Sequence, residues 1–244
     1  MQKKVLITGV LGGIGGDLAK TFHDNGYYVI GLDIKEGPCA FSDLFIRFDL
    51  NQYCENEVYK AEMDLLFEDK IPYLNVLINN AAVQILSDLE NIQLADWRQT
   101  LNVNLTGPLL LSQLFCSRLT QNRGCIINIA SIHERLTKRK FISYATSKSA
   151  IVGLTKAMSV DLQGAVRVNS ISPAAIDTPM LHDGFDNDIT KIQQLDKLHP
   201  SQRIGKPFEV AQLALFMAKD EIRFLNGANI QIDGGISNVL KDLE

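Results

Sequence analysis

The chain has 244 residues, of which 46% are hydrophobic and 21% are charged, ordinary values for a globular protein. This composition excludes a disordered, collagen-like or coiled-coil chain, and the length allows one domain with a large buried core. The net charge of −4, with no long block of one sign, argues against a general surface for nucleic acids or anionic membranes.

The cysteines and the apolar runs indicate the compartment in which the chain works. The four cysteines form no Cys-x-x-Cys pair, so we expect reduced thiols rather than a disulfide framework or a zinc site. The apolar run Val5–Ile7 is broken by Thr8 and Gly9 too early for a signal peptide. No apolar run approaches the roughly 18 residues of a membrane span. We therefore expect a cytoplasmic protein without a membrane or nucleic-acid partner.

Apolar runs typical of β-strands alternate with stretches of helical periodicity along the whole chain. The predicted strands cover residues 5–8, 27–33, 44–48, 74–79, 125–131, 167–171 and 229–232. The predicted helices cover residues 14–25, 52–67, 94–121, 144–163 and 207–219. This alternation predicts one α/β domain over residues 1–244, with a Rossmann-type, doubly wound parallel sheet and helices on both faces. Ligands of such sheets bind at the carboxyl ends of the strands.

A glycine-rich segment joins the first predicted strand to the first predicted helix. It reads Thr8-Gly9-Val10-Leu11-Gly12-Gly13-Ile14-Gly15-Gly16. Glycines permit a tight turn and let the backbone approach a pyrophosphate, whose charge then lies at the helix N-terminus. With a strand before it and a helix after it, the segment predicts a dinucleotide site. The expected contacts are Gly9, Gly12, Gly13, Ile14 and Gly15.

Asp33 indicates which nucleotide binds. It ends the second predicted strand, about 20 residues after Gly13, where a ribose-binding acid belongs. Its carboxylate would accept hydrogen bonds from the ribose hydroxyls and repel a 2′-phosphate. No Arg or Lys lies in Val10–Gly12 to neutralise such a phosphate, and we expect Lys35 to face solvent. The sequence therefore favours NAD over NADP, with a helix or turn cap as the alternative role of Asp33.

Three further residues predict acid–base chemistry. Tyr144 and Lys148 are four residues apart, so a helix places them on one face. A phenol has a reference pKa near 10, too high for a base at neutral pH, and a nearby ammonium favours the phenolate. Ser131 ends a predicted strand whose carboxyl end should face the cofactor, where a hydroxyl can polarise a carbonyl oxygen. Together they predict proton transfer at an alcohol or a carbonyl.

These motifs, in this order, resemble the short-chain dehydrogenase/reductase family over nearly the whole chain. The resemblance also includes Asp49-Leu50, Asn79-Asn80-Ala81-Ala82, Asn104, Ser172-Pro173, Thr178 and Asp233-Gly234-Gly235. Ala82 and Ala174 depart from it, because glycine is usual at both positions. We expect small backbone adjustments there, with cofactor affinity as the property that would suffer.

The resemblance implies a role for each residue. Tyr144 would be the catalytic acid/base, Lys148 would lower its pKa and hold the nicotinamide ribose, and Ser131 would steady the substrate oxygen. Asn104 would hold a water that links Lys148 to solvent. The cofactor site would also include Asp49, Leu50, Asn80, Ala81, Pro173, Ala174, Ile176 and Thr178. The implied reaction is hydride transfer between NAD(H) and an alcohol/carbonyl pair, without a metal.

The substrate is the feature that the sequence describes least. His133 is expected near the pocket mouth as a contact for a polar substrate, with an ordinary loop histidine as the alternative. The run Lys138-Arg139-Lys140 is attributed to a solvated loop, with attraction of an anionic substrate as the alternative. In the family, residues 179–206 would form the substrate lid. The long helices 94–121 and 144–163 pack across subunits in related proteins, which implies a homotetramer.

We therefore expect an NAD-dependent enzyme that interconverts a small secondary alcohol and its ketone. A sugar, polyol or hydroxy acid is favoured over a steroid or an acyl thioester. One alternative is an NADP-linked reductase of 3-oxoacyl thioesters, against which Asp33 argues. The other is a non-catalytic NAD-binding sensor, against which the intact Ser131, Tyr144 and Lys148 argue.

Overall fold

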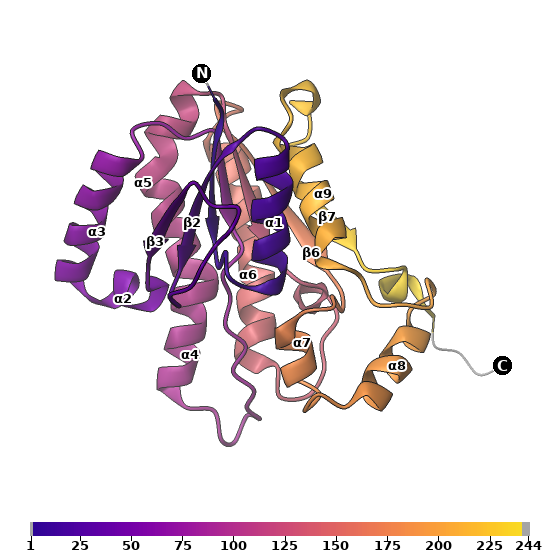
Figure 1. Ribbon diagram of the computed structural model, residues 1–244. Coiled ribbons are helices and arrows are strands. Elements are labelled where there is room, and N and C mark those ends of the chain that lie inside the picture. The colour runs from indigo at the N-terminus through magenta and orange to yellow at the C-terminus, as the bar shows by residue number, and fades with distance from the viewer. Residues whose placement is uncertain (1, 241–244) are drawn as a thin grey trace.

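Seven parallel strands form one sheet in the computed structural model, which describes residues 2–240 (Figure 1). In chain order they are β1 (Lys4–Thr8), β2 (Tyr28–Asp33), β3 (Leu44–Arg47), β4 (Val76–Asn79), β5 (Cys125–Ile129), β6 (Arg167–Pro173) and β7 (Asn229–Ile232). Their spatial order, β3-β2-β1-β4-β5-β6-β7, confirms the predicted doubly wound sheet. The winding reverses between β1 and β4, so the carboxyl ends of these strands border the crevice where such sheets bind ligands.

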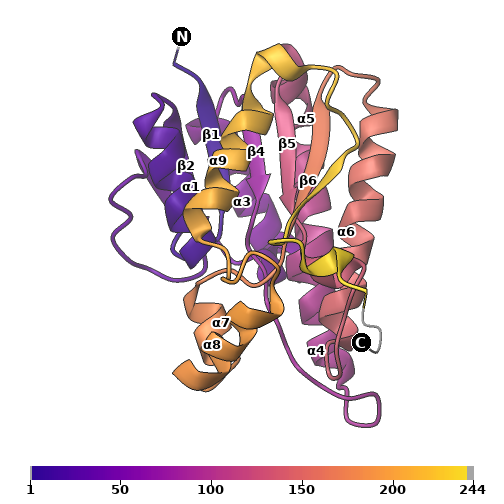
Figure 2. The same ribbon diagram turned by 90° about the vertical axis from the view of Figure 1, so that its right-hand side faces the viewer.

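Helices cover both faces of the sheet, which explains why the strands are apolar on successive residues. On one face lie α1 (Gly13–Asp24) and α9 (Pro207–Ala218), and on the other α3 (Glu57–Lys70), α5 (Gly107–Gln121) and α6 (Ile142–Asp161) (Figures 1 and 2). In β1, Val5 and Ile7 pack toward α1 and α9, whereas Leu6 packs toward α3 and α5. Each such fully buried side chain contributes about 1.5–3 kcal/mol.

Two predicted helices are each interrupted. Residues 52–67 form parts of α2 (Leu50–Glu55) and α3, because Asn56 between them is extended and its side chain accepts the Val58 and Tyr59 N–H groups. The helix predicted over 94–121 is divided into α4 (Leu94–Leu101), a π-helical turn η1 (Asn102–Thr106) and α5. Pro108 has no N–H, so it cannot form the usual helical bond to the Asn104 carbonyl. Just before it, the Gly107 N–H bonds to Asn102 O, five residues back, which is the bond of a π-helical turn. The wider turn places Asn104 at the carboxyl edge of the sheet.

The segment expected to form a lid contains two helices that the sequence did not predict. These are α7 (Pro179–Asp183) and α8 (Ile189–Leu198), capped by the side chains of Thr178 and Asp188. α7 is too short for a clear pattern, and in α8 polar and charged residues separate the apolar ones, of which only Ile192 is buried. Both helices lie below the carboxyl ends of the strands in two perpendicular views (Figures 1 and 2). Single-turn helices η2 (Ile132–Glu134), η3 (Asp220–Ile222) and η4 (Ile236–Asn238) complete the described chain.

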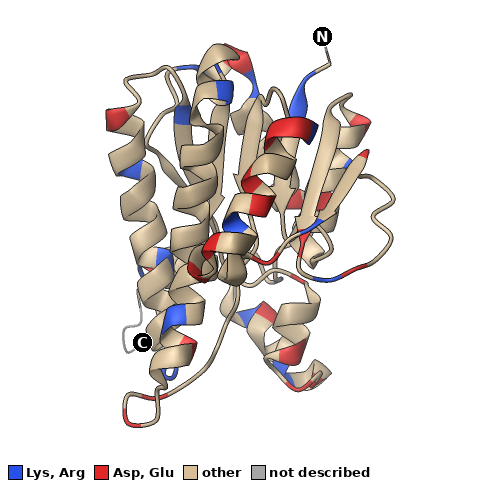
Figure 3. Ribbon diagram, turned by 90° about the vertical axis from the view of Figure 1, so that its left-hand side faces the viewer, with Lys and Arg blue, Asp and Glu red and all other residues tan. Residues whose placement is uncertain are grey.

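Charged residues of both signs are interspersed over the elements visible in Figure 3, as the small net charge suggests. All four cysteines are free. Within residues 2–240, no helix combines the length and the apolar character that crossing a membrane requires.

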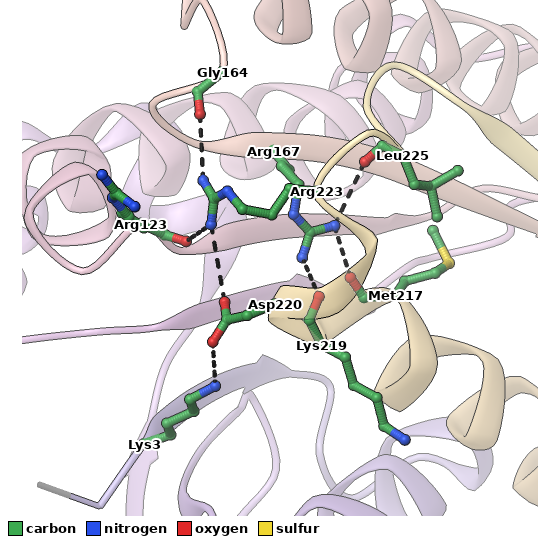
Figure 4. Close-up of polar contacts among 9 residues, drawn as sticks. All are labelled: Lys3, Arg123, Gly164, Arg167, Met217, Lys219, Asp220, Arg223 and Leu225. Atoms are coloured by element: carbon green, nitrogen blue, oxygen red, sulfur yellow. Dashed lines mark hydrogen bonds and ion pairs between the residues drawn. The ribbon is translucent and has the colours of Figure 1, made fainter.

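At the amino-terminal ends of the strands, opposite to the predicted site, a buried arginine bonds to the end of a helix (Figure 4). The Arg167 guanidinium donates to the carbonyls of Met217 at 2.9 Å and Lys219 at 3.0 Å. These carbonyls lie at the C-terminus of α9, where they have no partner within the helix and where a cation is favourable. Nearby, the exposed Lys3 forms an ion pair with Asp220 at 2.6 Å. These contacts stabilise the end of the sheet opposite to the strand ends that bear the predicted site.

Mutation of the buried arginine is expected to lower the free energy of unfolding more than mutation of the exposed ion pair. Arg167→Met is expected to lose about 3 kcal/mol of unfolding free energy, because each buried carbonyl left unpaired costs ~1–3 kcal/mol. The control, Lys3→Met, removes an exposed ion pair and is expected to lose less than ~1 kcal/mol. Urea unfolding measures both, and equal losses would contradict this account of Arg167.

Candidate active site

The glycine-rich loop is packed so closely that side chains would not fit. An added Cβ at Gly15 would lie 2.0 Å from Gly9 O, and one at Gly9 would lie 2.9 Å from Ala81 Cα. Gly9 also has a φ of +68°, which favours glycine. The Asn80 side chain donates to Thr8 O at 2.9 Å and Gly9 O at 3.1 Å. The loop after β1, the start of α1 and the loop after β4 therefore form one unit.

The N-terminus of α1 fits the pyrophosphate of a dinucleotide. The helix starts at Gly13 with neither a side-chain cap nor an acidic residue in its first turn, so its first N–H groups remain donors for an anion. An added Cβ at Gly13 would lie 2.7 Å from the Thr178 side chain. Gly13 therefore lies against the segment after β6, where any side chain would collide with Thr178. The glycine loop, residues 9–15, is called the glycine cradle below.

Asp33 stands beside this cradle at the end of β2 and is buried. Its carboxylate accepts the Leu11 N–H at 2.9 Å and the Lys35 N–H at 3.0 Å. The turn-capping role weighed above is therefore present, and each oxygen keeps a further lone pair. The Lys35 side chain is exposed, as expected. The result is a negative charge held next to the glycine loop.

The fold brings Ser131, Tyr144 and Lys148 together at the carboxyl end of β5. Ser131 follows β5 and caps η2, while Tyr144 and Lys148 lie on α6. All three are buried, with 8%, 8% and 2% of their surface exposed. The Lys148 ammonium donates to Ile129 O at 2.7 Å and lies 5.6 Å from the centre of the Tyr144 ring.

The pKa of Tyr144 shifts in the direction opposite to the one expected from the sequence. Burial raises the pKa of Tyr144 to about 12, although its hydrogen bond with Ser131 acts in the opposite direction. Burial also lowers the pKa of Lys148 to about 8. The predicted lowering of the tyrosine pKa is not seen, because desolvation dominates and the ammonium bonds to the Ile129 carbonyl. At neutral pH the phenol is protonated and can donate to an oxygen beside it.

Asn104 links three segments of the site. Its amide donates to Val83 O and to Ser147 Oγ, both at 3.0 Å, and its oxygen accepts the Val83 N–H at 2.9 Å. Ser147 in turn donates to Tyr144 O at 2.7 Å. Asn104 therefore holds the loop after β4 against the helix that carries the tyrosine. The sequence did not single out Ser147, whose role depends on this tertiary contact.

The other expected cofactor residues lie in loops that directly follow strands or in the first turns after them. These are Asp49 and Leu50 after β3, Asn80 and Ala81 after β4, and Pro173, Ala174, Ile176 and Thr178 at or after the end of β6. Asp49 caps α2 by accepting the Asn51 and Gln52 N–H groups, a structural role that the sequence did not predict. Ala82 and Ala174 are not among the residues with positive φ, so alanine in place of glycine causes no backbone strain there.

His133 lies against Tyr144, the expected acid/base. Its ring stacks on Phe141 with centres 4.4 Å apart and meets the Tyr144 ring edge-on at 5.7 Å. Its Nδ1 lies 3.1 Å from Thr137 Oγ1. Burial, with a smaller effect from Lys138, lowers the pKa of His133 to about 4, so the ring is neutral at pH 7. The expected contact of His133 with a polar substrate stays a prediction, and the structure shows its ring next to that of Tyr144. The sequence did not indicate a role for Phe141, because a single apolar residue before a helix forms no recognisable pattern.

Comparisons with known proteins agree with this geometry. Residues 9–237 match the family model described as enoyl-(acyl carrier protein) reductase. NAD-dependent glycerol dehydrogenase of Listeria innocua is 31% identical, over 96% of this chain and 93% of its own. The 3-oxoacyl-[acyl-carrier-protein] reductase FabG of Thermotoga maritima is also 31% identical, over 96% of this chain and 97% of its own. The ligand-free structure of Thermoplasma acidophilum aldohexose dehydrogenase is 32% identical with a TM-score of 0.91, covering 100% of this chain and 97% of that one.

Replacement of the tyrosine hydroxyl tests the site. Tyr144→Phe is expected to lower the rate of NADH-dependent ketone reduction by about 10³-fold, because it removes the acid while leaving the ring in place. NADH affinity, followed by nicotinamide fluorescence, is expected to change less than about twofold. A variant that keeps most of its activity would contradict the role of Tyr144, and a collapse of NADH binding would indicate a structural role.

Proposed function

The chain belongs to the short-chain dehydrogenase/reductase family and is an NAD(P)-dependent oxidoreductase of CH–OH groups, and we propose that it uses NAD(H) to interconvert a small secondary alcohol and its ketone. The observation that carries the proposal is the burial of Ser131, Tyr144 and Lys148 together at the same carboxyl edge of the sheet as the glycine cradle. When bound, the nicotinamide supplies or accepts the hydride.

Each polar residue of the site has one task in this proposal. Tyr144 Oη gives its proton to the carbonyl oxygen during reduction and takes it back during oxidation. Ser131 Oγ donates a hydrogen bond to the same oxygen and polarises the carbonyl. The Lys148 ammonium, 5.6 Å from the tyrosine ring centre, offsets the negative charge that develops on the phenolate. Asn104 supports this arrangement through Ser147 and is proposed to hold the water that connects Lys148 to solvent.

The residues of the cradle fit a dinucleotide in a definite orientation. The pyrophosphate would lie at Gly12, Gly13, Ile14 and Gly15, the adenine between Asp49–Leu50 and Asn80–Ala81, and the nicotinamide carboxamide at Pro173–Ala174, Ile176 and Thr178. Asp33, buried beside Leu11, would accept the hydroxyls of the adenosine ribose. A 2′-phosphate would meet this carboxylate with no basic residue in the glycine loop to compensate for it, which favours NAD.

The substrate would enter under the segment 179–206, which we propose as the lid. Its helices α7 and α8 border the carboxyl edge of the sheet, and loops at this edge commonly carry specificity. His133, neutral and edge-on to Tyr144, would contact a hydroxyl or another polar group of the substrate. A small polyol, sugar or hydroxy acid fits this contact better than a steroid, and two of the relatives above are named for glycerol and an aldohexose.

A second candidate is an NADP-linked reductase of 3-oxoacyl thioesters. It is supported by the Thermotoga maritima relative and by the description of the matching family model. The position of Asp33 beside the cradle argues against it, because such an enzyme must accommodate a 2′-phosphate. Cofactor preference therefore separates the two candidates. A non-catalytic sensor is disfavoured by the intact and closely packed Ser131, Tyr144 and Lys148.

Cofactor titration tests the proposal. The wild type is expected to bind NADH at least tenfold more tightly than NADPH, a difference of about 1.4 kcal/mol, as measured by nicotinamide fluorescence. Asp33→Asn is expected to reduce this preference, because the repulsion of the 2′-phosphate is lost. Lys35→Ala, a change at an exposed neighbour, serves as the control and should leave it unaltered. Tighter binding of NADPH by the wild type would favour the thioester reductase instead.

We also propose a homotetramer that works in the cytoplasm. The helices expected at the subunit contacts bear exposed apolar side chains, including Leu94, Leu109 and Val160, which a partner subunit would cover. Light scattering coupled to size-exclusion chromatography is expected to give four times the chain mass. A mass equal to that of one chain would contradict the proposal.

A further inference from the structure

We propose that Lys138 selects substrates that carry a carboxylate, so that the enzyme acts on a small hydroxy acid or its oxo acid. This inference rests on the proposed function and narrows its substrate class. It starts from the basic run Lys138-Arg139-Lys140, to which the reaction itself assigns no task.

Lys138 lies where the loop before α6 meets the proposed lid. Its Nζ is 4.7 Å from the centre of the Phe141 ring and 5.4 Å from that of Phe185, which stands between α7 and α8. Both distances lie within the range of cation–π attraction. The ammonium therefore lies between Phe141, which directly precedes α6, and Phe185 of the proposed lid.

Phe141 connects this ammonium to the reacting centre. Its ring stacks on His133 and meets the Tyr144 ring edge-on, with centres 6.0 Å apart. The backbone on either side is held as well, because the Ser87 N–H donates to Lys140 O at 3.0 Å. A continuous aromatic wall thus runs from the catalytic tyrosine to the Lys138 ammonium.

Lys138 has no carboxylate partner among residues 2–240. Other lysines of the described chain, such as Lys20 and Lys60, form ion pairs at 2.6 Å, whereas no Asp or Glu oxygen of these residues lies within 4.0 Å of Lys138 Nζ. The nearest acid in the same loop, Glu134, accepts a hydrogen bond from Asn229 at 3.1 Å. The loop that carries Lys138 therefore supplies no carboxylate to neutralise the charge of its ammonium.

Lys138 as a whole is exposed, and burial of part of its side chain lowers its pKa. A partly desolvated ammonium gains more from an anion than a fully hydrated one does, because the effective dielectric constant around it is lower. With the carbinol carbon at Tyr144 and the cation at the lid, the fitting substrate carries its carboxylate at the end remote from the reacting carbon. His133, between the two, would face the middle of such a molecule.

Matched acids and amides test this assignment. We would measure kcat/KM for NADH-dependent reduction of 4-oxopentanoate and 5-oxohexanoate and of their primary amides, which keep the shape and lose the charge. The wild type is expected to prefer each acid, and Lys138→Met to lower kcat/KM for the acids about tenfold or more, the size of a charge-assisted hydrogen bond. The amides should change less than about twofold, since Met keeps the apolar stem between the rings.

Three comparisons decide the outcome. Lys138→Arg is expected to restore the preference for acids, and Arg139→Met, which removes a charge from the same loop, is expected to leave it unchanged. An equal loss for acids and amides in Lys138→Met would overturn the assignment and leave Lys138 as a contact between loop and lid. Turnover of the amides as fast as the acids by the wild type would also overturn it, while the proposed function would stand.

A binding measurement keeps the assignment testable even if no ketone of this set is reduced, a result that would count against the proposed function. Pentanoate and pentanamide are titrated into the complex of enzyme with NADH, followed by nicotinamide fluorescence. Tighter binding of pentanoate by the wild type, lost in Lys138→Met and kept in Arg139→Met, supports the carboxylate site. Equal binding of the acid by wild type and Lys138→Met would overturn it.

Discussion

The close approach of three backbone segments at the end of β1 is the constraint on which the rest of the site depends. Gly9 and Gly15 lie so near to each other and to the loop after β4 that a single methyl group would separate them. This contact directs the N-terminus of α1 toward the crevice and brings Asn80 onto the loop. It also positions Leu11 to bond Asp33. The proposed pyrophosphate site and the position of Asp33 thus both depend on the absence of two side chains.

The residues proposed for catalysis are costly to bury, and each buried polar group among them has its own hydrogen-bond partner. The Lys148 ammonium is accepted by the Ile129 carbonyl, and the Asn104 amide is fully paired with Val83 and Ser147. Buried polar groups without such partners would destabilise the domain. Desolvation nevertheless moves the pKa values of Tyr144 and Lys148 toward their neutral forms, so that the pocket favours a proton on the phenol.

The two edges of the sheet differ in how they are held. At the amino-terminal edge, Arg167 is buried and bonds to the carbonyls that end α9 (Figure 4). At the carboxyl edge lie longer loops, the helices α7 and α8 of the proposed lid, and Lys138, which forms no ion pair within residues 2–240. Loops at such an edge can change specificity without changing the fold, because the scaffold that supports them is held elsewhere.

The sequence by itself determined the seven parallel strands, the glycine cradle and the set Ser131, Tyr144 and Lys148, because strand alternation and motif spacing are local properties of a chain. It did not determine α7, which is a single short turn, or α8, whose apolar residues recur every third position within a polar, mixed-charge segment. It also did not determine the π-helical turn at Asn104, which the contact of the Asn104 side chain with Val83 accompanies. The tertiary structure alone decided the direction of the Tyr144 pKa, because burial is imposed by distant segments. It also decided that the Lys138 ammonium lies 5.4 Å from the centre of the Phe185 ring, a contact between two loops that no local pattern encodes.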